Sequence, residues 1–167
     1  MPGGQHRAQT IRPIRCAVVT ISDTRTLETD ESGKTIGSLL EAAGHGVIVR
    51  ELVRDEPGEV RERIVQHCER SDCHAVLTTG GTGLAPRDQT YEAVTALLDK
   101  RLDGFGELFR MLSYAEIGPA AMLSRAVAGV RGRTAVFCMP GSVPAVRLAM
   151  ERLILPELPH IAWLLRG

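Results

Sequence analysis

The chain has 167 residues, the size of one domain, and its 44% hydrophobic and 24% charged content excludes a disordered or fibrous protein. Its 20 Lys and Arg balance 20 Asp and Glu, so no net charge draws the whole molecule to nucleic acid or to a membrane. No apolar run reaches the roughly 20 residues of a membrane span, and residues 1–15 lack the apolar stretch of a signal peptide. We therefore expect a cytoplasmic protein that holds any anionic ligand with local groups.

The first half of the chain predicts alternating strands and helices. Residues 1–14 have no periodic apolar pattern and are expected to be flexible, whereas residues 15–167 show no linker or repeat and are expected to form one domain. Residues 16–21, 47–53 and 75–79 are strand candidates, the first and last being apolar runs typical of strands buried on both faces. Helical spacing is found in two groups: Ile36, Leu39, Leu40 and Ala43 before Gly44, and Val60, Ile64 and Cys68 after Pro57.

The second half predicts further helices and a pair of strands. Residues 126–130 and 134–139 are strand candidates, and Arg131-Gly-Arg133 between them could form a hairpin turn. Three more helices are marked by Val94, Leu97 and Leu98; by Phe105, Leu108, Phe109 and Leu112; and by Val146, Ala149, Met150 and Leu153, with a disturbance at Pro156 and Pro159. This order predicts an α/β fold of three layers, α/β/α, around a mostly parallel sheet, whose ligands bind beyond the carboxyl ends of the strands.

A glycine-rich loop follows the third expected strand. In Thr79-Gly80-Gly81-Thr82-Gly83, missing Cβ atoms allow backbone N–H groups to turn toward an anion, so the loop is a candidate phosphate site. Glycines that only form a turn are the alternative. The chain has no Walker A sequence, and Pro86 stands where the dinucleotide fingerprint has its last glycine. A P-loop NTPase and a standard dinucleotide site are therefore not supported.

Four carboxylates also fall after expected strands, namely Asp23, Asp55, Glu56 and Asp88. Carboxylates repel phosphates unless a cation intervenes, and Mg²⁺ bound by one or two carboxylates and by phosphate oxygens removes that conflict. Each acid taken alone is a solvated loop residue or a helix N-cap as readily as a ligand. Their common place at the strand ends indicates nucleotide chemistry that depends on Mg²⁺.

Two other kinds of site find no support in the sequence. His67, Cys68, Cys73 and His74 are zinc-ligand types, but their spacing fits no common zinc pattern and Cys68 falls on an apolar helical face. The serines lack the G-x-S-x-G elbow of serine hydrolases. None of the four cysteines forms a C-x-x-C pair, so we expect no disulfides.

Five motifs together resemble the MoaB/Mog family of molybdenum-cofactor biosynthesis proteins. They are Thr79-Gly-Gly-Thr-Gly83, Pro86-Arg-Asp88 with Thr90, Gly104-Phe-Gly-Glu107 with Arg110, Ser124-Arg-Ala126, and Pro140-Gly-Ser142. The likeness extends from about Arg15 to the C-terminus. It implies a three-layer α/β fold, usually trimeric, and adenylylation of molybdopterin by ATP with Mg²⁺ and release of pyrophosphate.

The resemblance also implies roles for particular residues. Asp55 and Asp88 match the acidic residues that would act in catalysis and hold Mg²⁺, and residues 79–83 would line the nucleotide phosphates. The pterin side would be formed by Ser22, Ser124, Pro140, Gly141 and Ser142. The expected ligands are pterin and nucleotide, and the expected protein partners are identical subunits, as a homotrimer or higher homo-oligomer, and other molybdenum-cofactor enzymes. Neither nucleic acid nor a membrane is an expected partner.

Two features leave alternatives open. Glu107 and Arg110 would either close the site by hydrogen bonding or pair with each other at i and i+3. Many relatives continue Pro-Gly-Ser with Pro or Thr and then Lys, whereas this chain has Val143-Pro144-Ala145 and so lacks one anion contact. A non-catalytic module that binds or carries molybdopterin in the same pathway is therefore the alternative to an adenylyltransferase.

Overall fold

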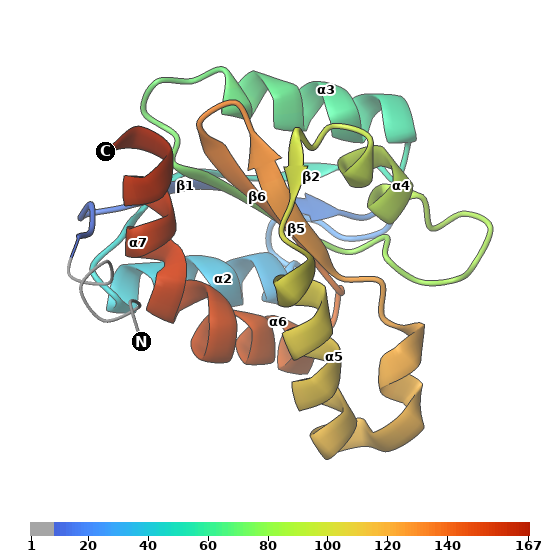
Figure 1. Cartoon of the computed structure of the whole chain (residues 1–167). Coiled ribbons are helices and arrows are strands. Elements are labelled where there is room, and N and C mark those ends of the chain that lie inside the picture. Colours follow the sequence, from blue (N-terminus) through green and yellow to red (C-terminus); the bar gives the residue numbers. More distant parts are fainter. Residues whose placement is uncertain (1–8) are drawn as a thin grey trace.

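The computed structural model of the chain describes residues 9–167 and has one six-stranded sheet with helices on both faces (Figure 1). The strands are β1 (Arg15–Ile21), β2 (Gly46–Val53), β3 (Ala75–Thr79), β4 (Lys100–Arg101), β5 (Val127–Arg131) and β6 (Thr134–Met139). They lie in the order β2-β1-β3-β6-β5-β4. Pairing is parallel from β2 to β6 and antiparallel for β6 with β5 and β5 with β4. The predicted mostly parallel α/β sheet is confirmed.

The helices form two layers around this sheet. They are α2 (Glu31–Ala42), α3 (Pro57–Cys68), α4 (Thr90–Thr95), α5 (Asp103–Ile117), the 3-10 helix η1 (Gly118–Leu123), α6 (Val143–Ala149), the π-helix η2 (Met150–Ile154) and α7 (Leu155–Arg166). In Figure 1, α3 and α4 cover one face, α2, α6 and α7 cover the other, and α5 extends away from the sheet. None of the described helices is both long and apolar enough to cross a membrane.

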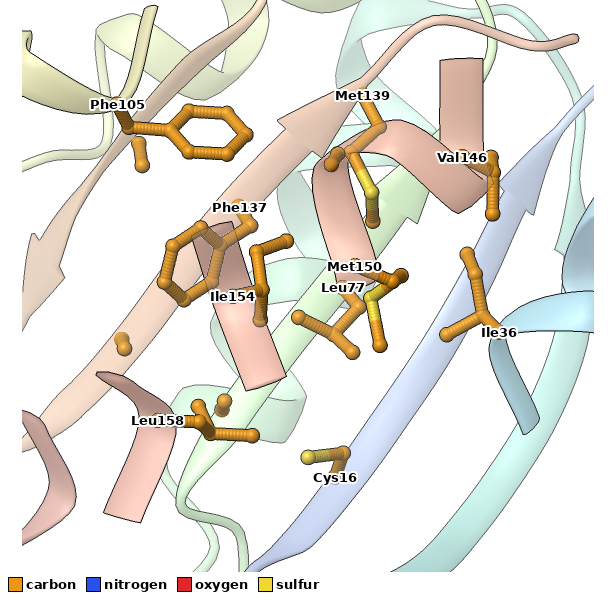
Figure 2. Close-up of a cluster of buried hydrophobic side chains, with 14 of the residues drawn as sticks. Cys16, Ile36, Leu77, Phe105, Phe137, Met139, Val146, Met150, Ile154 and Leu158 are labelled. Atoms are coloured by element: carbon orange, nitrogen blue, oxygen red, sulfur yellow. The ribbon is translucent and has the colours of Figure 1, made fainter. Parts of the chain in front are cut away.

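Successive side chains of the central strands point to opposite faces of the sheet, so the hydrophobic core has two parts, one on each face. In β1, Cys16 and Val18 pack on the side of α2, α6 and α7, whereas Ala17 and Val19 pack on the side of α3 and α4. Figure 2 shows the first part, where Leu77 and Phe137 of the sheet lie close to Met150 and Ile154. Full burial of one such side chain stabilises the fold by about 1.5–3 kcal/mol. Both faces of the strands are apolar because both are covered.

The helix predicted around Val94, Leu97 and Leu98 ends earlier than its apolar spacing indicated. Helix α4 stops at Thr95, and Leu97 and Leu98 lie in the following turn, although they still pack against the core. The backbone leaves the helix because the N–H of Asp99 donates to the carbonyl of Val130, 2.7 Å away. This bond leads into β4, a two-residue edge strand that the sequence did not indicate.

The ends of the chain also differ from expectation. The chain stays helical through Pro156 and Pro159, and the predicted disturbance takes the form of the π-helix η2 before them. Pro156 lies in the first turn of α7, directly after η2, and Pro159 lies inside α7. Within the segment expected to be flexible, Ile14 is fully buried and the N–H of Ile11 donates to the carbonyl of Pro159. The remainder of that segment, residues 1–8, lies outside the described residues.

Candidate functional site

The loops at the carboxyl ends of β1, β3 and β6 surround a pocket of about 360 Å³, called here the rim pocket. It is lined by Thr20, Ile21, Ser22, Arg25, Ser32, Thr79, Gly80, Gly141 and Ser142. Five of these are predicted site residues: Ser22, Thr79, Gly80, Gly141 and Ser142. The parallel order β1-β3-β6 brings them together, because it places the ends of these three strands side by side.

Hydrogen bonds between loops fix the walls of the rim pocket. The hydroxyl of Thr79 donates to the carbonyl of Pro140 at 2.8 Å, and that of Ser32 donates to the carbonyl of Gly141 at 2.6 Å. The N–H of Gly80 donates to the carbonyl of Met139 at 3.0 Å. The predicted residues 140–142 are therefore tied to β3 and to the start of α2, and the pocket is formed without a ligand.

Helix α2 is anchored beneath the pocket by a buried carboxylate. Asp30 is the N-cap, and its side chain accepts hydrogen bonds from the N–H of Gly33 at 2.9 Å and the hydroxyl of Thr20 at 2.8 Å. The guanidinium of Arg50 forms an ion pair with it at 3.1 Å. A buried charge is tolerated when it is paired and fully hydrogen-bonded, as this one is. Asp30 is thus neutralised and holds the helix rather than repelling an anion.

The glycine-rich loop takes a backbone shape that only glycine permits. Gly80 and Gly81 have φ values of +100° and +70°. A Cβ on Gly80 would lie 2.4 Å from the carbonyl oxygen of Ile21, and one on Gly81 would lie 1.9 Å from Oγ1 of Thr90. The loop therefore passes directly over the end of β1 and over the first residue of α4. This close approach explains both glycines on structural grounds, and Gly80 also lines the rim pocket.

Three carboxylates lie beside this loop and outside the lining of the rim pocket, and Asp23, Asp55 and Asp88 are called here the acidic cluster. The N–H of Asp55 donates to Oδ1 of Asp23 at 3.2 Å. Asp55 Oδ1 approaches Gly81, at 3.3 Å from the place of an added Cβ, and Asp88 Oδ2 approaches Gly83, at 2.7 Å from the corresponding place. The predicted pair Asp55 and Asp88 is therefore next to the predicted phosphate loop. Glu56 is exposed and makes no capping hydrogen bond to α3.

The electrostatics of the acidic cluster centre on Asp55. Its Oδ1 atom is buried and has no hydrogen-bond partner. Burial raises the pKa of this carboxyl, and the nearby Asp88 and Asp23 raise it further. Asp23 differs because hydrogen bonds from Arg87 lower its pKa. A buried acceptor without a donor, held beside like charges, is the arrangement that a bound cation would relieve.

The acidic cluster is suited to Mg²⁺ that is shared with a phosphate ligand, rather than to a metal ion held by protein side chains alone. Within residues 9–167, no group of three His, Cys, Asp or Glu side chains is placed to hold a metal ion. Mg²⁺ commonly takes only one or two carboxylates and fills its other positions with water and phosphate oxygens. The unpartnered Asp55 Oδ1 and the adjacent Asp88 meet that requirement.

Comparison with known proteins identifies the family. Residues 17–160 match the family model described as "Probable molybdopterin binding domain". The molybdenum cofactor biosynthesis protein B of Bacillus cereus is 54% identical over 160 residues, covering 95% of each chain. The chain belongs to this family. Its role is in molybdenum cofactor biosynthesis.

Solved structures of MoaB proteins share the fold. A crystal structure of a molybdenum cofactor biosynthesis protein B has a TM-score of 0.91 and 55% identity, covering 94% of this chain and 98% of that one. The tungsten cofactor synthesizing protein MoaB of Pyrococcus furiosus has a TM-score of 0.83 and 36% identity, with coverage of 94% and 99%. The resemblance to the MoaB/Mog family is thus confirmed.

Among the family motifs, Arg125 has a position that the sequence did not reveal. Its guanidinium donates to the carbonyls of Thr82 at 3.0 Å, Gly83 at 2.6 Å and Asp88 at 3.0 Å. It also forms an ion pair with Glu92. One arginine therefore holds both ends of residues 82–88. The acceptors are backbone carbonyls, which every residue type has, so the sequence could not indicate these bonds and only the fold shows them.

Three other motif residues, Ser124, Arg110 and Thr90, have positions or hydrogen-bond partners that the sequence did not predict. Ser124 was assigned to the pterin side, but it does not line the rim pocket, and its Oγ is buried without a partner. Arg110 donates to the carbonyls of Ser124 and Ala126, and the described structure records no bond between it and Glu107. The i and i+3 pair is therefore not formed. Thr90, which the sequence left without a role, has a buried unpartnered hydroxyl beside Gly81.

The two histidines that were considered as zinc ligands have hydrogen-bond partners within the protein. His67 contacts Glu51 through Nε2 at 2.6 Å, and His74 Nδ1 accepts the N–H of Arg15 at 3.0 Å. All four cysteines are free, as expected. Burial raises the pKa of Cys68 and Cys138 to about 12, so these thiols stay protonated at neutral pH.

Proposed function

We propose that this protein transfers the adenylyl group of ATP to the phosphate of molybdopterin in a reaction that requires Mg²⁺. The family's role in molybdenum cofactor biosynthesis supplies the pathway. The observation that carries the proposal is the buried, unpartnered Oδ1 of Asp55, which lies beside the glycine-rich loop and near Asp88. A metal–triphosphate complex satisfies both this oxygen and the loop.

The chemistry is an in-line displacement. An oxygen of the pterin phosphate attacks the α-phosphorus of ATP, a new P–O bond forms, and the bond to the bridging oxygen of the β-phosphate breaks. Pyrophosphate leaves with that electron pair. The tasks of the protein are to position the two substrates and to offset their negative charge. A bound Mg²⁺ supplies the charge neutralisation that two anions need in order to approach.

The residues divide these tasks between the two sides of the loop. Asp55 and Asp88 hold the cation, and the backbone of residues 79–83 supports the triphosphate. The rim pocket, with the hydroxyls of Ser22 and Ser142 and the backbone of Gly141, accepts the pterin substrate. Pro140 supports this side through its hydrogen bond with Thr79 of β3, whereas the carbonyl of Ser124 accepts from Arg110 of α5.

The test is release of pyrophosphate from ATP, Mg²⁺ and molybdopterin. We expect turnover by the native protein, loss of at least about a hundredfold in kcat for Asp88→Asn, and native turnover for the exposed control Glu56→Gln. The absence of pyrophosphate from folded protein with Mg²⁺ would disprove the proposal. Equal losses in Asp88→Asn and Glu56→Gln would show that the acidic cluster has no special role.

A non-catalytic pterin carrier is the second candidate. It is favoured by Val143-Pro144-Ala145, which begins α6 at the rim pocket without a charged side chain. This candidate predicts molybdopterin binding that is unchanged by ATP and by Asp88→Asn. Pyrophosphate release that depends on molybdopterin would eliminate it.

We also propose that the protein forms a homotrimer or higher homo-oligomer. Large apolar side chains are exposed along α5 and η1, namely Leu108, Met111, Tyr114, Ile117, Met122 and Leu123. Exposed apolar side chains that are concentrated on two consecutive helices are typical of a protein interface. Light scattering should give a mass of at least three chains, and a monomeric mass at micromolar concentration would refute this expectation.

A further inference from the structure

The rim pocket has an uneven charge distribution. Of the nine side chains or backbones that line it, Arg25 is the only ionisable one; the remainder are hydroxyls, two glycines and Ile21. Within residues 9–167, no carboxylate lies within ion-pair distance of Arg25. The pocket thus contains one positive charge and no negative charge.

The loop after β1 holds Arg25 at the pocket. The hydroxyl oxygen of Ser22 accepts the N–H groups of Thr24 at 3.2 Å and of Arg25 at 3.1 Å, so the chain turns directly after the strand. The Nη1 of Arg25 donates to the carbonyl of Thr29 at 3.0 Å. This single bond orients the guanidinium, and its Nε and Nη2 groups have no acceptor among the described residues. Two adjacent donors suit the paired oxygens of a phosphate.

Nearby acidic residues do not cancel this charge. Asp30 is already paired with Arg50, and Glu31 pairs with Lys34. Asp23, which follows Ser22, pairs with Arg87 on the side of the acidic cluster. Asp23, Asp30 and Glu31 each pair with another cation, whereas Arg25 forms no ion pair with a carboxylate of the described residues.

The two sides of the loop therefore suit different anions. A triphosphate carries its own Mg²⁺, which carboxylates bind, so it belongs beside Asp55 and Asp88. A phosphate monoester brings no metal, and a cationic donor from the protein binds it more strongly than neutral groups do. Since residues 143–145 carry no charge, that donor has to come from another loop.

We propose that Arg25 binds the phosphate monoester of the pterin substrate in the rim pocket and replaces the lysine absent after Pro140-Gly-Ser142. The assignment rests on the proposed function, because that function supplies the pterin phosphate. It makes Arg25 a residue that positions the attacking phosphate and selects phosphorylated over unphosphorylated pterins. The rim pocket then holds the acceptor, and the acidic cluster holds the metal–nucleotide.

The test compares three ligands by calorimetric titration. The probes are 6-hydroxymethylpterin phosphate, the same pterin without phosphate, and ATP with Mg²⁺. For Arg25→Ala we expect affinity for the phosphorylated pterin to fall by at least about tenfold, and affinity for the other two probes to stay within about twofold. Arg25→Lys should recover part of the loss, because it restores the charge without the fork. Arg61→Ala, on the exposed face of α3, is the matched control and should bind all three probes as the native protein does.

Each contrary result has a definite meaning. If native protein binds both pterins equally, or if Arg25→Ala weakens both equally, Arg25 does not recognise phosphate. If Arg25→Ala weakens binding of ATP instead, the guanidinium serves the nucleotide and the assignment is overturned. Failure of the proposed function looks different, since pyrophosphate release would be absent while binding of the pterin phosphate still depended on Arg25.

Discussion

Replacing Asp55 by Asn should stabilise the fold while it removes activity. Asn has nearly the same shape as Asp but carries no charge. In the native protein the carboxylate of Asp55 is half-buried, its Oδ1 has no donor, and Asp88 and Asp23 are close enough to raise its pKa. Folding therefore places a carboxylate where its charged form is disfavoured, and Asp55→Asn removes that penalty.

The expected gain is about 1 kcal/mol at neutral pH, because Asn removes the desolvated charge and its repulsion from Asp88 and Asp23, while Asp55 is only partly removed from solvent. For a domain of this size, 1 kcal/mol corresponds to a rise in Tm of about 2–4 °C. The sign follows from the pKa. A folded-state pKa above the ordinary value of 3.8 penalises the ionised fold at neutral pH, and the penalty disappears as the pH falls through the folded pKa to below 3.8.

Thermal unfolding of native protein and Asp55→Asn at pH 7.5 and at pH 4 measures this effect. The variant should unfold at a higher temperature at pH 7.5, and its advantage should shrink at pH 4. Addition of ATP with Mg²⁺ should raise the Tm of native protein and have little effect on the variant. A variant that is less stable than native protein at pH 7.5 would refute the reasoning, because Asp55 would then contribute to folding rather than to binding.

Two further predictions concern stability. Gly81→Ala should cost at least about 2 kcal/mol in the free energy of unfolding, because φ is +70° and the added Cβ would overlap Oγ1 of Thr90. In urea unfolding, adding Thr90→Ala should restore part of this loss, and no restoration would show that the contact with Thr90 does not matter. Burial lowers the pKa of His45, whose Nδ1 accepts the N–H of Ile14, so its contribution to stability is present above the ordinary value of 6.5 and is lost as the pH falls below it. Between pH 7.5 and pH 5, native protein should therefore lose more stability than His45→Asn does, and parallel pH profiles would contradict this assignment.

The central strands of the sheet could be predicted from the sequence. Residues 16–21, 75–79 and 134–139 are short segments of mostly apolar residues, and all three form central strands with both faces covered. A strand that is buried on both faces needs apolar residues whatever its position in the sheet, so the local sequence was enough to predict these strands. The short edge strand β4 was not, because Lys100 and Arg101 have no strand pattern and pair only since β5 offers its free edge.

The sequence by itself determined which residue types follow each strand, including the glycine-rich loop and the carboxylates Asp55 and Asp88. Only the tertiary structure decided how they group. The sheet order places the ends of β1, β3 and β6 around one pocket, leaves Ser124 outside it, and brings Arg25 to it from the loop after β1. The physical reason is that the residue types of a loop are set by its own sequence, whereas the loops beside it depend on strand order and on long-range hydrogen bonds. The hydrogen bonds of Arg125 are an example, since they connect residues about 40 positions apart in the chain.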